Sequence, residues 1–102
     1  MFRVTSHFHH PEDPEAFLAH YRSTHSVLAA TLPGLRYYGW GLAVMPDGSR
    51  PPHFLVTVLD WDSKEDALAA LASTEARATN ADTPLLGSAG VDVNFHEVNQ
   101  VV

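Results

Sequence analysis

Apolar and polar side chains alternate at both ends of the chain. Phe2, Val4 and Phe8 alternate with polar residues, and this two-residue period predicts a half-buried strand over residues 1–8. The same period predicts a last strand over residues 91–102. Both ends of the chain therefore belong to a sheet.

A helical period follows the first strand. Residues 14–31 predict one amphipathic helix, because apolar side chains recur there at spacings of three and four. Asp13 suits the N-cap position, Pro14 suits the first turn, and Pro33-Gly34 ends the helix. The face expected to be buried carries Leu18, Tyr21, His25, Leu28 and Leu32.

The middle of the chain predicts a hairpin and then more helix. Residues 35–45 and 53–61 are rich in aromatic and β-branched side chains, and a turn-rich segment joins them. Ser63 is a suitable cap for a second helix. Residues 75–90 can hold a short further helix before the last strand.

The predicted order of elements is β-α-β-β-α-β. This is the ferredoxin-like pattern, an α+β fold in which two helices cover one face of a four-stranded antiparallel sheet. The length of 102 residues is that of one domain, so we expect residues 1–102 to form a single unit.

The third predicted strand is apolar on both of its faces. Helices cover only one face of such a sheet, yet Leu55, Leu59 and Trp61 are apolar as well as the side chains that alternate with them. An uncovered apolar face usually marks an interface, and we expect a two-fold homodimer through the sheet faces. The alternative is a single apolar strand lying under a loop.

Composition narrows the classes of partner. The chain carries 12 acidic and 6 basic residues, a formal charge of -6, and the bases are scattered rather than clustered. Nucleic-acid or anionic-membrane binding is therefore not expected. The chain has no cysteine and no apolar run as long as a membrane span, and no signal-peptide pattern follows Met1, so we expect a cytoplasmic protein.

His25 is the first candidate for chemistry. A histidine on an apolar helix face can accept or pass a proton near neutral pH. The alternative is a core histidine bonded to a backbone carbonyl. The facing strand offers aromatic side chains with polar tips, and Gly39 and Gly41 are expected to leave room above the sheet. The residues expected to bind a small apolar ligand are Tyr21, Leu28, Tyr37, Tyr38 and Trp40.

Asp82 is the second candidate. It either caps the segment that follows it or points into the pocket to orient His25 or a ligand hydroxyl. Among the other histidines, His7 and His9 have a spacing on one strand face that can hold a metal, with His96 as a possible third ligand. We predict no metal site there, because a solvated strand end explains the cluster.

Several known motifs are absent from the chain. It contains no P-loop, no GxGxxG, no GxSxG and no HExxH. Nucleotide cofactors and serine or zinc hydrolysis are therefore not expected, and we predict an activity that needs no organic cofactor.

Residues 17–38 combine an aromatic start, a histidine and a Pro-Gly-Leu entry into the second strand. The pattern consists of Phe17, Tyr21, His25, Leu28, Pro33, Gly34, Leu35 and Tyr38. It resembles the signature of the EthD family, named after a protein of ethyl tert-butyl ether degradation. Residues 58–71 and Asp82 fit the later part of the family pattern, so the resemblance covers nearly the whole chain. One departure is Tyr21, where many members carry tryptophan.

The resemblance implies a dimeric α/β barrel, in which two ferredoxin-like chains pack sheet to sheet around pockets between helices and sheet. It does not imply one reaction, because relatives include cofactor-free monooxygenases, isomerases and cyclases. We therefore predict an enzyme of small-molecule catabolism or secondary metabolism. The alternatives are a non-catalytic binding or accessory protein and a haem or metal protein.

Overall fold

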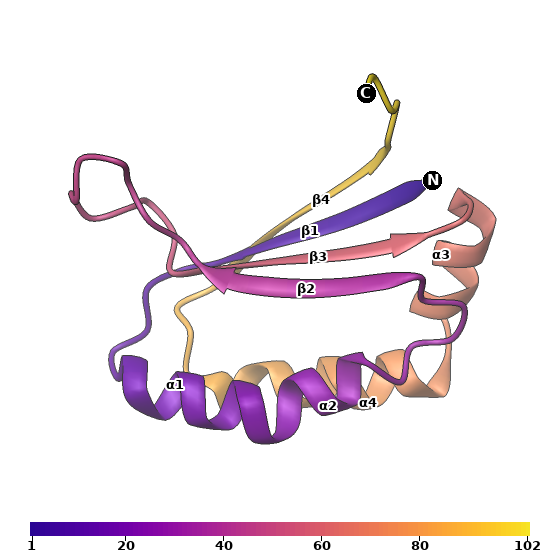
Figure 1. Cartoon of the computed structure of the whole chain (residues 1–102). Coiled ribbons are helices and arrows are strands. Elements are labelled where there is room, and N and C mark those ends of the chain that lie inside the picture. The colour runs from indigo at the N-terminus through magenta and orange to yellow at the C-terminus, as the bar shows by residue number, and fades with distance from the viewer.

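The computed structural model describes residues 1–102 and contains one antiparallel sheet. Its strand order is β2-β3-β1-β4 (Figure 1), so the predicted ferredoxin-like α+β fold is confirmed. The strands are β1 (Phe2–Phe8), β2 (Tyr37–Leu42), β3 (Leu55–Trp61) and β4 (Val91–Glu97).

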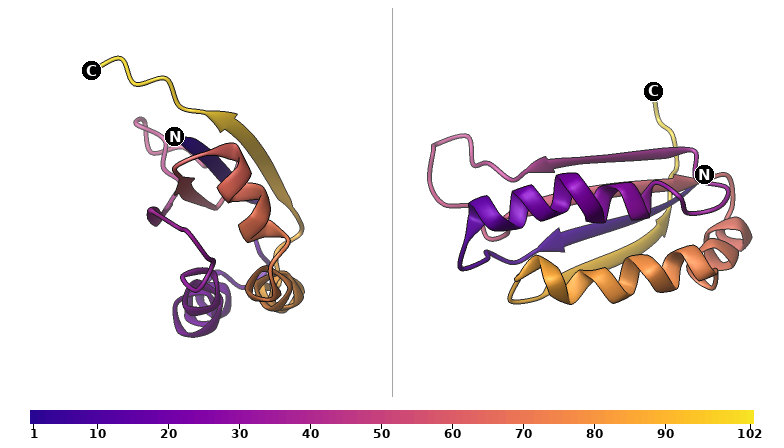
Figure 2. Two further views of the ribbon diagram at one scale, coloured as in Figure 1. Left: turned by 90° about the vertical axis from the view of Figure 1, so that its right-hand side faces the viewer. Right: turned by 90° about the horizontal axis from the view of Figure 1, so that it is seen from below.

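All helices lie on one side of the sheet or at its end (Figures 1 and 2). The long helical rod after β1 and the helix α4 run side by side beneath the sheet, whereas α3 stands at the end near the N-terminus. No helix is both long and apolar enough to span a membrane. The helices are α1 (Pro14–His20), η1 (Tyr21–His25), α2 (Ser26–Ala29), α3 (Lys64–Leu71), α4 (Thr74–Asp82) and the 3₁₀ turn η2 (Thr83–Leu86).

The helix starts follow the predicted capping residues. The Asp13 side chain accepts a hydrogen bond from the backbone N–H of Ala16 at 3.1 Å, and Ser63 caps α3 in the same way. Ser73 caps α4, the further helix expected in residues 75–90. Local sequence therefore determines where these helices begin.

The predicted first helix forms, but its centre is a π-turn. The backbone N–H of Ser26 donates to the carbonyl of Tyr21, five residues earlier. In a regular α-helix, positions four apart drift around the axis by about 40°. A π-turn holds more residues per turn and reverses that drift. The side chains that it keeps on the buried face are Phe17, Tyr21, His25, Ala29 and Leu32, while Leu18 and Leu28 are only half-buried.

Two apolar clusters form the core between helices and sheet. One gathers around Trp61, at the end of the sheet covered by α3. The other gathers around Phe17 and Tyr21, beneath the opposite end of β1 and β3, where Phe8 pairs with Leu55. Trp61 is fully buried, and its Nε1 donates to the carbonyl of Pro33 at 2.9 Å. This bond fixes the connection between α2 and β2 to the third strand.

The sequence predicted that Leu55, Leu59 and Trp61 form the uncovered face of the sheet, and this prediction was wrong. Leu55 and Trp61 are fully buried on the helix side of β3, and Leu59 lines the cavity on that side. The apolar side chains that β3 presents on its open face are Val56 and Val58, because neighbours along a strand alternate between faces.

The open face of the sheet is otherwise largely polar. The register places Tyr37, Asp60 and Arg3 in one row across β2, β3 and β1. Both carboxylate oxygens of Asp60 accept from the Arg3 guanidinium, at 2.8 and 3.0 Å. The open face therefore combines a two-residue apolar strip with an ion pair, rather than the face of Leu55, Leu59 and Trp61 that the sequence predicted.

Candidate functional site

A cavity of about 350 Å³ lies between the helices and the sheet. Strand β4 forms one wall, and its side chains Val93 and Phe95 remain 43% and 55% exposed, so the cavity opens toward this edge strand. The lining is mainly apolar. Its polar side chains are Ser6, Tyr21, His25, Tyr38, Thr57, Thr79, Asn80 and Thr83.

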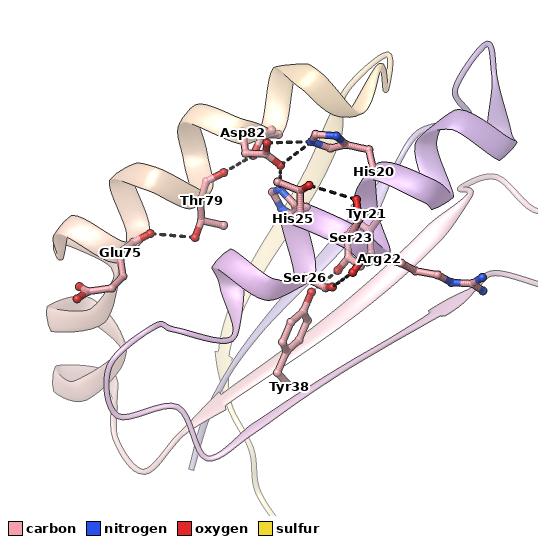
Figure 3. A network of polar contacts seen from close by, with 12 residues as sticks. His20, Tyr21, Arg22, Ser23, His25, Ser26, Tyr38, Glu75, Thr79 and Asp82 are labelled. Atoms are coloured by element: carbon pink, nitrogen blue, oxygen red, sulfur yellow. Dashed lines mark hydrogen bonds and ion pairs between the residues drawn. The ribbon is translucent and has the colours of Figure 1, made fainter.

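His25, which lines this cavity, forms a buried hydrogen-bonded pair with Asp82 behind it. Nδ1 of His25, at the end of the π-turn, lies 2.9 Å from Oδ2 of Asp82, at the end of α4. His20 approaches the same carboxylate from α1, with its Nε2 2.9 and 3.1 Å from the two oxygens (Figure 3). The three side chains join the two helices beneath the sheet.

The second ring nitrogen of His25, Nε2, has no hydrogen-bond partner within the protein. It is not fully buried, because no fully buried side-chain nitrogen or oxygen of the protein lacks a partner. His25 itself lines the cavity. With an Nδ1–H donated to Asp82, the neutral imidazole presents Nε2 as a proton acceptor. The sequence alternative of a histidine bonded to a backbone carbonyl is wrong.

Asp82 does not cap the turn that follows it. Its side chain makes no capping hydrogen bond to η2, so the cap interpretation is wrong. Burial alone would raise the pKa of the carboxyl, but hydrogen bonds from His20 and His25 outweigh burial and hold its pKa below the usual value. Asp82 therefore stays ionised at neutral pH and fixes the orientation of both imidazoles.

The depressed pKa of Asp82 predicts a pH-dependent contribution to stability. A carboxyl whose folded-state pKa is lowered stabilises the fold above its unfolded pKa of about 3.9, and this contribution disappears as pH falls through the folded pKa. Asp82→Asn should lower the free energy of unfolding by about 1.5–3 kcal/mol at neutral pH, the usual range for hydrogen bonds to charged groups. Urea unfolding of both proteins across a pH series should show the difference shrinking below about pH 4. Parallel stability curves would contradict the assignment.

Tyr21 and Tyr38 form the other polar part of the site. Their hydroxyl oxygens lie 2.5 Å apart, one from the π-turn and one from β2. Burial, and then the bond to Tyr38, raises the pKa of Tyr21; burial also raises the pKa of Tyr38, against an opposing effect of Tyr21. Both hydroxyls are therefore protonated at neutral pH. Only one hydrogen can occupy the shared contact, so the second remains available to a ligand in the cavity.

The other expected ligand-binding residues are placed differently. The Trp40 ring packs against Tyr21, with centroids 5.1 Å apart, and Arg22 lies over its outer face at 5.5 Å, so Trp40 supports the site from behind. Leu28 is half-buried and does not line the cavity. Tyr37 was predicted wrongly, because it is 52% exposed on the opposite face of the sheet.

The glycines of β2 do not make room for a ligand. Gly39 and Gly41 share a face with Tyr37, which is the open face. The Tyr37 ring folds over Gly39, and a methyl group at Gly39 would collide with the Tyr37 ring and hydroxyl. The glycine therefore accommodates a tyrosine, and the expectation that it opens the pocket was wrong.

Sequence reasoning missed His20 as a partner of the carboxylate. His20 and His25 are five residues apart, a spacing that places two side chains on different sides of a regular α-helix. The π-turn between them brings both to Asp82. The polar residues of α4, Thr79 and Asn80, were also missed, although their position one turn before Asp82 was visible in the sequence.

The histidine cluster after β1 has partners other than the expected one. The Nε2 atoms of His9 and His53 each lie 2.9 Å from Oδ2 of Asp92. His96, the expected neighbour, pairs with Arg3 near the other end of β1, and its Nδ1 contacts the Glu97 carbonyl. His53, which precedes β3, belongs to the cluster as well.

Comparisons with known proteins agree with this architecture. An EthD domain model matches residues 9–85. An uncharacterized 11.0 kDa protein of Rhodococcus erythropolis, from the thcB-thcC intergenic region, is 34% identical over 102 residues, which is 100% of this chain and 99% of that protein.

Two crystal structures share the fold. An EthD family protein from Bacillus halodurans C-125 is 26% identical, with a TM-score of 0.89 over 97% of this chain and 99% of its own. A dimeric ferredoxin-like protein of unknown function from Thermobifida fusca YX is 19% identical, with a TM-score of 0.73 over 95% of this chain and 90% of its own. From its matched domain and its full-length relative, the chain belongs to the EthD family.

Proposed function

We propose that the protein is a cytoplasmic, cofactor-independent enzyme that moves a proton on an apolar, oxygenated small molecule held between helices and sheet. The observation that carries this proposal is the buried His25–Asp82 pair: Nδ1 is bound to the carboxylate, Nε2 has no partner, and His25 lines the cavity. A histidine whose tautomer is fixed by a buried carboxylate is suited to act as a general base.

The cavity selects the class of substrate. Its walls are mainly apolar, and no carboxylate, lysine or arginine side chain lines them. A cyclic or aromatic compound with a carbonyl or phenol oxygen fits this combination, because its carbon skeleton meets apolar walls and its oxygen meets the hydroxyl pair of Tyr21 and Tyr38. A charged substrate would find no opposite charge in the lining.

The proposed first step is enolisation. His25 Nε2 removes a proton from a carbon next to the substrate carbonyl. The electron pair of that C–H bond forms the C=C bond of the enolate, and the π pair of the carbonyl moves to its oxygen. One of the two tyrosine hydroxyl hydrogens is not used in the Tyr21–Tyr38 hydrogen bond. This hydroxyl donates a hydrogen bond to the resulting oxyanion. Returning the proton at a different carbon gives an isomerisation, and attack of the enolate on a second carbonyl gives a cyclisation. With molecular oxygen as co-reactant, the enolate carbon of a CH₂ group forms a hydroperoxide, which loses water and leaves a second carbonyl.

Deuterium incorporation tests the proton transfer before the natural substrate is known. The protein is incubated in D₂O with cyclic 1,3-diketones and aromatic ketones, and the mass of each compound is followed over time. The proposal expects deuteration at the carbon next to the carbonyl, faster than in buffer alone, for at least one compound that binds. Binding without accelerated exchange would favour a non-catalytic carrier, for which the mainly apolar lining would suffice.

We also propose a homodimer through the open sheet face. Val56 and Val58 form an apolar strip there, and the related Thermobifida fusca protein is described as dimeric. Size-exclusion chromatography with light scattering should give twice the mass of one chain. Val58→Lys should give the monomer mass, whereas Ala69→Lys on the exposed side of α3 should not. A monomeric wild-type protein would contradict this proposal.

A further inference from the structure

We infer that His9, His53 and Asp92 form a binding site for a divalent transition-metal ion. One imidazole Nε2 from each histidine and one carboxylate oxygen lie within 4.8 Å of one another. Both Nε2 atoms are already 2.9 Å from the same oxygen, Asp92 Oδ2. Neighbouring ligand atoms around an ion bound at about 2.0–2.1 Å are separated by about 3 Å, so the cluster has nearly the spacing of a coordination shell.

Three separate parts of the chain supply the ligands, and the backbone holds them together. His9 follows β1, His53 precedes β3 and Asp92 lies in β4, so all three meet at the end of the sheet from which the β2–β3 loop projects (Figure 1). The His9 N–H donates to the Gly90 carbonyl at 2.9 Å, and the N–H of Phe54 donates to the Phe8 carbonyl at 2.7 Å. These ladder bonds position the ligands before any ion binds.

A glycine and a serine complete the support for His9. Ser88 Oγ donates to the carbonyls of His9 at 3.1 Å and Gly90 at 2.7 Å, which fixes the turn into β4. The His9 ring packs against Gly90.

The donor set favours a transition metal. Two imidazoles and one carboxylate suit zinc, iron, nickel or copper, whereas magnesium and calcium prefer sites made of oxygen alone. Three protein ligands leave further positions for water or a small ligand. His53 and Asp92 also line a shallow hollow on the open face together with His7, whose ring centroid is 5.2 Å from that of His53.

This site is separate from the proposed proton-transfer site. Asp92 and His7 face the open side of the sheet, opposite the helices, whereas His25 and Asp82 lie in the helices beneath it. The two inferences therefore stand or fall independently.

Cobalt and zinc binding to tag-free protein tests the inference. Protein treated with a chelator and then titrated with Co²⁺ should bind one ion per chain with a ligand-field absorption band, and Zn²⁺ should displace it. His53→Ala and Asp92→Asn should each weaken binding by more than about 100-fold, because even outer partners of metal ligands contribute 10–100-fold.

Two control variants identify the site. His96→Ala removes an exposed histidine outside the cluster, and His25→Ala removes the histidine of the proposed proton-transfer site; both should retain full Co²⁺ binding. Circular dichroism of every variant verifies folding. The inference is overturned if chelator-treated protein binds no Co²⁺, or if His53→Ala and Asp92→Asn bind it as wild type does. Loss of binding in His25→Ala with retention in His53→Ala would also overturn it.

Discussion

Replacing His25 by alanine should slow enzyme-catalysed substrate deuteration by about 10²–10⁴-fold, the usual contribution of a positioned general base. His25 lines the cavity with its Nε2 free of any hydrogen-bond partner, and no acidic or lysine side chain lines the cavity to replace it. The measurement is the initial rate of deuterium incorporation in a compound shown to bind, compared between wild type and variant at equal occupancy.

A second substitution separates catalysis from stability. His25→Asn can keep an N–H donor toward Asp82 but has no basic nitrogen. It should be as inactive as the alanine variant while unfolding closer to wild type in urea. His96→Ala should retain wild-type rates. Unchanged rates in both His25 variants would remove His25 from the mechanism, whatever their stability.

Replacing Trp61 by alanine should lower the free energy of unfolding by about 3–5 kcal/mol, the usual loss for a large buried aromatic side chain. Trp61 is fully buried among apolar residues of β1, α3 and α4, and it also donates a hydrogen bond to Pro33. A domain of this size has a total stability of about 5–15 kcal/mol, so the loss removes a large part of it. Urea unfolding followed by circular dichroism measures it.

Two other variants separate the parts of this loss of stability that come from the hydrogen bond and from the burial of the ring. Trp61→Phe keeps most of the apolar volume but loses the donor to the Pro33 carbonyl, and it should cost about 1–2 kcal/mol. Trp40→Ala removes a half-buried tryptophan and should cost less than Trp61→Ala. A loss below about 1 kcal/mol for Trp61→Ala would mean that the cluster around it contributes little to stability.

The fold was predictable because the capping residues and the apolar periods of each segment agree with the order of strands and helices along the chain. Asp13 and Ser63 cap the helices that their positions predict, and the alternation of Phe2, Val4 and Phe8 is the buried pattern of β1. The assignment of the two faces of β3 failed for a physical reason. When both faces are apolar, a two-residue period does not indicate which one meets the helices; packing against Phe17 and Leu32 decides it.

The sequence predicted the residues of the candidate site mainly where they share one face of the first helix. His25 and Tyr21 lie where their spacing places them, and Asp82 is the acid that meets His25. The contribution of His20 and the trio of His9, His53 and Asp92 depend on contacts between segments far apart in sequence. Tyr37 and Tyr38 are adjacent and chemically alike, so only the strand register shows which one reaches the cavity.

The π-turn gives this region a tolerance to chain length. Deleting Ser23 or Thr24 would allow a continuous α-helix, which costs no backbone hydrogen bond and removes no charge. His25 would then stand seven residues after Phe17, which on a regular α-helix is within about 20° of the same direction. The π-turn thus accommodates one residue more than a regular helix while His25 stays on the buried face. A one-residue deletion here is therefore expected to preserve the ferredoxin-like fold and to leave His25 directed toward the carboxylate of α4.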